Sequence, residues 1–164
     1  PRSTLFPYTT LFRSIICRCG KKGCLETEVS GSALHRILCE KVKNGQSSIL
    51  SKRILTGETS LTLEEIVDAT NKEDILCIEL VEEIGRKLGR YLAGLINLFN
   101  PELVVIGGTL ALTEDYILQP IKTAIRKYSL NLVSKDSAVV LSKLQAKAGV
   151  IGACLLSRSK LFEW

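Results

Sequence analysis

Three cysteines, Cys17, Cys19 and Cys24, lie within a single eight-residue segment near the start of the sequence. Their spacing, C-x-C-G-x-x-G-C, lets three thiolates reach one centre, and Gly20 and Gly23 permit the left-handed backbone that so tight a loop requires. Because thiolates and imidazoles form tetrahedral zinc sites, residues 17–24 are predicted to form a structural zinc site. We call this segment the cysteine knuckle.

A disulfide framework is the alternative interpretation of the cysteines. The chain has six of them, but we find no secretory signal pattern. The remaining three, Cys39, Cys77 and Cys154, fall within apolar helical patterns, where cysteine acts as a small core hydrophobe. These observations favour metal binding over disulfides and predict a cytoplasmic protein.

A structural zinc site needs four ligands, and the knuckle supplies three. The one histidine of the sequence, His35, lies in a helix predicted to begin near Glu28. It sits beside the apolar stripe of that helix, which predicts a half-exposed helix residue and not a ligand. We therefore expect the fourth ligand to come from upstream sequence that is not here, and the chain to be truncated.

Residues 1–14, PRSTLFPYTTLFRS, look like the translation of a common sequencing-adapter oligonucleotide. We expect this segment to be non-native, with the protein proper beginning at Ile15 and residues 15–164 forming part of one domain. A short natural strand is the alternative for these residues. Their apolar positions are too few for a membrane span, which needs about 20 in a row.

The composition is that of a folded globular protein, with 46% hydrophobic and 24% charged residues. No apolar stretch free of charges approaches transmembrane length, so no membrane partner is expected. Basic and acidic residues alternate along the predicted helices, as in residues 82–87, which favours a solvated surface over a nucleic-acid-binding patch.

The hydrophobic pattern predicts helices that alternate with two short, buried strands. Thr62 and Glu65 form a capping box at the start of one helix, and Gly85, Gly89 and Gly94 in the longest helix indicate close packing against another element. Two strands cannot form a stable sheet alone, so further strands are expected from the missing half of an α/β sandwich. The predicted helices are 28–43, 49–55, 63–71, 72–99, 114–128 (with a break near Pro120) and 148–160, and the strands are 103–106 and 138–141.

Several segments together resemble the second half of the ROK family (repressors, open reading frames, sugar kinases). They are the cysteine motif followed by Leu25-Glu26 and Ser30-Gly31, then FNPELVVIGG at 99–108 and AGVIGA at 148–153. The similarity runs from Ile15 to about Phe162. It implies an α/β fold of the actin-like ATPase (ribonuclease-H-like) type, of which this chain is the C-terminal lobe.

The resemblance also implies roles for individual residues. Cys17, Cys19 and Cys24 would be zinc ligands, with an upstream histidine as the fourth. Glu26 matches a glutamate that hydrogen-bonds the hydroxyls of a pyranose ring in related kinases. From the residues alone, the favoured interpretation of Glu26 is an exposed acid stabilised by a helix N-terminus; the resemblance shifts the preference to sugar contact.

Gly107 and Gly108 follow a predicted strand and lead toward a helix, where a phosphate or adenosine can approach the backbone. In the kinases of the family this position lies against the nucleotide. A plain tight turn is the alternative, and the following residues, 109–112, carry no further phosphate-binding signature.

Two functions fit the resemblance: the sugar-sensing body of a transcriptional repressor, which we favour, and a glucokinase-like, ATP-dependent sugar kinase. A kinase needs a phosphate-binding loop and a catalytic aspartate from the upstream half, so no catalytic residue is assigned here and the fragment itself is expected to be inactive. ATP is expected only for the kinase. The expected partners are a sugar, further copies of the chain, and DNA through a missing N-terminal module. A zinc-knuckle nucleic-acid module is a third class, disfavoured by the mixed charge and the large apolar remainder.

Overall fold

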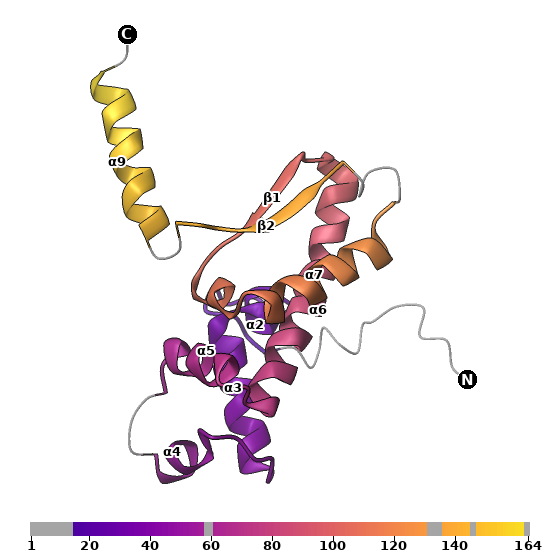
Figure 1. The fold of residues 1–164 in the computed structure, drawn as a ribbon, viewed down its shortest axis with the longest axis vertical. Coiled ribbons are helices and arrows are strands. Elements are labelled where there is room, and N and C mark those ends of the chain that lie inside the picture. The colour runs from indigo at the N-terminus through magenta and orange to yellow at the C-terminus, as the bar shows by residue number, and fades with distance from the viewer. Residues whose placement is uncertain (1–14, 58–60, 131–135, 145–146, 163–164) are drawn as a thin grey trace.

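A computed structural model describes residues 15–57, 61–130, 136–144 and 147–162 (Figure 1). The segment interpreted as adapter-derived, residues 1–14, lies outside the described residues. Helices dominate, and two strands form one small sheet. The elements in chain order are α2 (Glu26–Val29), α3 (Gly31–Lys43), α4 (Ser51–Thr56), α5 (Leu63–Asn71), α6 (Ile75–Phe99), β1 (Leu103–Ile106), the 3-10 helix η1 (Thr109–Thr113), α7 (Asp115–Tyr128), β2 (Ala138–Leu141) and α9 (Ala148–Leu161).

Side-chain caps mark the starts of α3, α5 and α6. The predicted capping box is confirmed: the Thr62 hydroxyl accepts from the Glu65 amide, and the Glu65 carboxylate accepts from the Thr62 amide. The prediction of one helix from Glu28 is wrong, because Ser30 adopts an extended conformation (φ −82°, ψ 167°) and its hydroxyl accepts a hydrogen bond from the Ala33 amide. Ser30 thus ends α2 and caps α3, so the knuckle is followed by a separate short helix.

Helix α6 runs through the centre of the molecule and packs most extensively against α7 (Figure 1). The two axes approach closely because Gly85 and Gly89 on α6 lie against the backbone of α7 at Ile117 and Ile121. The close packing predicted for these two glycines is confirmed. The same prediction is wrong for Gly94 within the described residues, since no atom of another element lies within 4 Å of the position its Cβ would take.

The strands β1 and β2 pair in parallel, with Leu103 opposite Ala138 and Ile106 opposite Leu141. The chain between them passes through η1 and α7, as expected for a β-α-β unit. Val104 and Ile106 on one face pack against the core. The other face is open, with Leu103 and Val105 each 54% exposed, so the prediction of fully buried strands is wrong for that face within the described chain.

Pro120 does not interrupt α7, contrary to the predicted break. Its ring lies over Gly85 of α6, where a Cβ on the glycine would come within 3.1 Å of the Cβ of Pro120. The proline therefore packs into the interface between the two helices. A lost backbone hydrogen bond at this position is tolerated when tertiary packing holds the helix.

Helix α9 projects from the end of β2, away from the other helices (Figure 1). The sequence predicted its position well, but none of its described residues is buried. Cys154 is exposed on it, so its prediction as a core residue is wrong, whereas Cys77 is buried and Cys39 is half-buried. Within the described ranges, no helix combines the length and the apolar character needed to cross a membrane.

Candidate metal centre and ligand cavity

The cysteine knuckle is a tight loop closed by its own backbone. The amide of Cys17 donates to the carbonyl of Lys21 at 2.8 Å, and the amide of Gly20 donates to the carbonyl of Cys17 at 2.8 Å. Gly20 and Gly23 have φ values of +82° and +76°. Both lie in the region that glycine adopts without strain, so the predicted role of the two glycines is confirmed.

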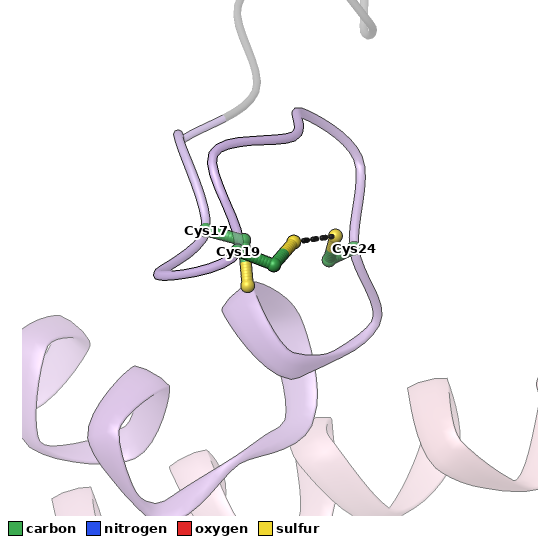
Figure 2. Close-up of side chains that lie close together, drawn as sticks. All are labelled: Cys17, Cys19 and Cys24. Atoms are coloured by element: carbon green, nitrogen blue, oxygen red, sulfur yellow. Dashed lines mark hydrogen bonds between the residues drawn. The ribbon is translucent and has the colours of Figure 1, made fainter.

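The three thiols converge inside this loop (Figure 2). All three Sγ atoms lie within 4.8 Å of one another, and those of Cys19 and Cys24 are 3.5 Å apart. Zinc–sulfur bonds of about 2.3 Å at tetrahedral angles separate the sulfurs by about 3.8 Å. The residues of the knuckle therefore fit a zinc ion with little rearrangement.

Mutual hydrogen bonding splits the pKa values of two thiols. The pKa of Cys19 is lowered, chiefly by the backbone amide of Lys21 and then by the thiols of Cys24 and Cys17. The pKa of Cys24 is raised to about 11, mainly because its thiol hydrogen-bonds to Cys19. Cys24 therefore holds a proton at neutral pH, and that proton must leave when a metal binds.

Only the three cysteines form a candidate metal-binding group within the described part of the chain. His35 is not among them. It lies half-buried on α3, where its Nε2 is 3.9 Å from the Sγ of Cys39. This is the half-exposed helix position that the sequence predicted.

Glu26 is the first residue of α2, two positions after the last cysteine. Its exposed side chain lines a cavity of about 190 Å³ that also reaches Cys17 of the knuckle. Cys17 of the metal-binding candidate and Glu26, the residue predicted to bind sugar, therefore line the same cavity. Its lining is completed by Ile15, Ile16, Arg18, Thr27, Ser32, Ala33 and Arg36.

Arg36 is one of the polar cavity residues that the sequence analysis did not predict. It donates from Nη2 to the carbonyl oxygen of Thr27 at 3.1 Å and from Nη1 to Glu40 at 3.3 Å. The sequence does signal the contact with Glu40, because an arginine and a glutamate four residues apart on a helix can form an ion pair. The contact with Thr27 spans nine residues across the α2–α3 break, and no periodic pattern signals it.

Gly107 and Gly108 lie elsewhere, between β1 and η1, and neither lines the cavity around Glu26. Gly108 has a φ of +90°, which requires glycine, and the space above it is open. The sequence predicted that Gly107 and Gly108 lead toward a helix. The element that follows them is η1, a five-residue 3-10 helix at Thr109–Thr113.

Comparison with known proteins identifies the family. The model of the ROK family matches residues 8–160. The chain is 35% identical over 136 residues to the glucokinase of Halalkalibacterium halodurans, covering 83% of this chain and 41% of the enzyme. It is 32% identical over 145 residues to the N-acetylglucosamine repressor of Escherichia coli O6:H1, covering 88% and 34%.

Similar solved structures also include both a ROK regulator and a ROK glucokinase. A ROK family transcriptional regulator, described as a homolog of the Escherichia coli Mlc protein, superposes with a TM-score of 0.77 at 31% identity, covering 90% of this chain and 36% of the regulator. A ROK family glucokinase from Streptomyces griseus, solved with glucose and AMPPNP, gives 0.75 at 27%, covering 89% and 48%. The chain thus spans about a third to a half of its relatives. It belongs to the ROK family and has the α/β, actin-like ATPase fold of that family, of which it covers a part.

Proposed function

We propose that this chain is the sugar-sensing body of a ROK transcriptional repressor, and that Glu26 binds the hydroxyls of the sugar. The observation that carries the proposal is that Glu26 opens into a cavity whose wall includes Cys17 of the knuckle. A carboxylate fixed beside a rigid loop accepts hydroxyl protons at a small entropic cost.

Cys17, Cys19 and Cys24 would hold the zinc ion, which supplies a cross-link within the loop when bound. The loop leads directly into α2, and a hydrogen bond links the two: the Thr27 hydroxyl donates to the carbonyl of Cys24 at 2.7 Å. Bracing the loop therefore limits the motion of Glu26. In this proposal the metal is structural, and sugar recognition belongs to the side chains of the cavity.

One observation favours the repressor. Gly107 and Gly108 lead into a five-residue 3-10 helix, which offers a weaker dipole to a phosphate than an α-helix does. The similarity to the N-acetylglucosamine repressor is compatible with this proposal.

A glucokinase-like sugar kinase is the second candidate, favoured by the 35% identity to the Halalkalibacterium halodurans enzyme. In that case ATP would lie against Gly107 and Gly108, where the open space above Gly108 leaves room for a ligand. The catalytic aspartate would come from outside the described residues.

The repressor proposal includes parts that lie outside this chain. DNA would be bound by a separate N-terminal module, the fourth zinc ligand would be an upstream histidine, and the protein would act as a homo-oligomer in the cytoplasm. Sugar binding would shift the oligomer between DNA-bound and released arrangements. Residues 15–164 would be its native portion, and residues 1–14 a foreign segment.

Calorimetric titration with N-acetylglucosamine and with glucose tests the role of Glu26. We expect Glu26→Gln to weaken binding of the preferred sugar at least about tenfold, because a charge-assisted hydrogen bond is replaced by a neutral one. Glu28→Gln is the matched control, since Glu28 shares α2 but does not line the cavity. Equal affinities for wild type and Glu26→Gln would reject the proposal.

Assays of ADP release and of operator binding on the intact gene product distinguish a repressor from a kinase. Sugar-dependent release of ADP from ATP would establish the kinase. Sugar-sensitive binding to operator DNA without ADP release is the result expected of the repressor.

A further inference from the structure

Arg36 projects from α3 into the cavity that holds Glu26 and is partly shielded, with its side chain 35% exposed. Its guanidinium makes two directed contacts. One nitrogen donates to the backbone of α2 at the carbonyl of Thr27, and the other is held by Glu40, one turn along α3. The ion pair with Glu40 thus fixes the orientation in which Arg36 reaches α2.

Helix α2 packs against α3 and α6 but is short and only partly covered. It is four residues long, begins without a side-chain cap at Leu25, and contains no buried residue. Val29, at its far end, packs against the core, and Ser30 starts α3. So short a helix is not stable by itself, and tertiary contacts must hold its first turn.

The first turn of α2 is held from two sides. The Thr27 hydroxyl ties it to the carbonyl of Cys24 in the knuckle, and Arg36 ties the Thr27 carbonyl to α3. Thr27 directly follows Glu26. Its backbone therefore sets the direction in which the Glu26 side chain enters the cavity.

We propose that Arg36 is a positioning residue for Glu26: by clamping the Thr27 carbonyl, it holds the first turn of α2 in the orientation that binds sugar. This inference rests on the proposed sugar-binding role of Glu26. It assigns the preorganisation of the site to a salt-bridged arginine on the neighbouring helix, in addition to the metal knuckle.

The test compares Arg36→Met, which keeps much of the apolar stem but removes the donors, with Arg36→Lys, which keeps one charged donor group. We expect Arg36→Met to weaken binding of N-acetylglucosamine or glucose about tenfold, as loss of one charge-assisted hydrogen bond predicts. Arg36→Lys should recover part of that loss. Zinc content and the thermal midpoint should stay close to those of the wild type.

Hydrogen exchange without sugar gives an independent readout. The amides of Thr27, Glu28 and Val29 in α2 donate to the carbonyls of Cys24 and Leu25, which directly precede the helix. They should exchange faster in Arg36→Met, while amides of α6 remain unchanged. An arginine that merely contacts the sugar would weaken binding without changing this exchange, which would overturn the proposal.

Two controls separate the clamp from the surface ion pair. Arg86→Met removes a comparable pair with Glu82 on α6, outside this cavity, and should leave sugar binding and α2 exchange unchanged. Thr27→Val removes the hydroxyl contact to Cys24 but keeps the carbonyl, and should leave the α2–α3 link intact.

Unchanged exchange and sugar affinity within twofold of wild type in Arg36→Met would overturn the inference. If Glu26→Gln leaves sugar affinity unchanged, the proposed function fails, while the exchange experiment still decides whether Arg36 clamps α2.

Discussion

Gly89 of α6 lies directly against Ile121 of α7: a Cβ on the glycine would come within 2.6 Å of the Ile121 carbonyl oxygen. It would also lie 2.8 Å from the Cβ of Ala124. No real Cβ fits at such distances, so the two helices cross at backbone contact. This crossing is the largest helix interface in the described chain.

We predict that Gly89→Ala lowers the free energy of unfolding by about 1–3 kcal/mol, because the added methyl group forces α6 and α7 apart. Gly94→Ala is the matched control on the same helix. Its Cβ would meet nothing within 4 Å, so it should raise the free energy of unfolding by up to about 1 kcal/mol through helix propensity. Urea unfolding followed by circular dichroism measures both, and equal effects would contradict the packing argument.

Asp74 gives a pH-dependent contribution to stability. Burial opposes ionisation of its carboxyl group, but hydrogen bonds from the amides of Ile49 (2.6 Å) and Cys77 (2.9 Å) outweigh burial and lower its pKa. Because the folded pKa lies below the unfolded value of about 3.9, the stabilisation is present above that pH and is lost as pH falls through the folded pKa.

We therefore predict that Asp74→Asn destabilises the protein at pH 7 and has a progressively smaller effect below about pH 4, where the wild-type carboxylate is protonated in the unfolded chain. Chemical unfolding of both proteins across this pH range checks the prediction. Asp68→Asn, at an exposed position of α5, serves as control. A constant difference between wild type and Asp74→Asn at all pH values would exclude the titration of Asp74 as its cause.

The cysteine knuckle predicts a defined metal stoichiometry. The purified intact gene product, with the upstream histidine present, should hold about one zinc ion per chain when supplied with zinc, as expected for one tetrahedral site. Cys24→Ala removes a thiol whose Sγ lies 3.5 Å from that of Cys19 and should abolish stoichiometric binding at micromolar zinc. Cys39→Ser changes a thiol outside the cluster and should bind zinc like the wild type. Elemental analysis after dialysis distinguishes these outcomes, and full zinc occupancy in Cys24→Ala would refute the site.

Glu114 joins η1 to α7 with φ +48° and ψ −115°, a backbone conformation that favours glycine. We predict that Glu114→Gly raises the free energy of unfolding by about 1 kcal/mol. The substitution releases backbone strain and keeps the hydrogen bond from the amide of residue 114 to the Ala111 carbonyl. Glu102→Gly, at an exposed residue with a negative φ, should instead be neutral or destabilising. Thermal unfolding compares the two variants, and a lower midpoint for Glu114→Gly would show that the loop is unstrained.

Features of this protein that depend on neighbouring residues could be predicted from its sequence. The spacing of Cys17, Cys19 and Cys24, with glycines between them, encodes a loop in which the thiols must meet, and the structure has them within 4.8 Å. The capping box at Thr62 and the strand at 103–106 follow in the same way from neighbouring residues. Such features depend on backbone dihedrals and on hydrogen bonds that span a few residues.

Only the tertiary structure decided what meets across longer separations. Gly89 and Gly94 carry the same sequence signal, but one faces α7 and the other faces open space. Arg36 reaches Thr27 because Ser30 breaks the chain into two helices that lie together. Whether an apolar strand face or helix is covered likewise depends on neighbours, as at Val105 and α9. A residue's own pattern sets its local conformation, whereas its contacts depend on how separate elements are arranged in space.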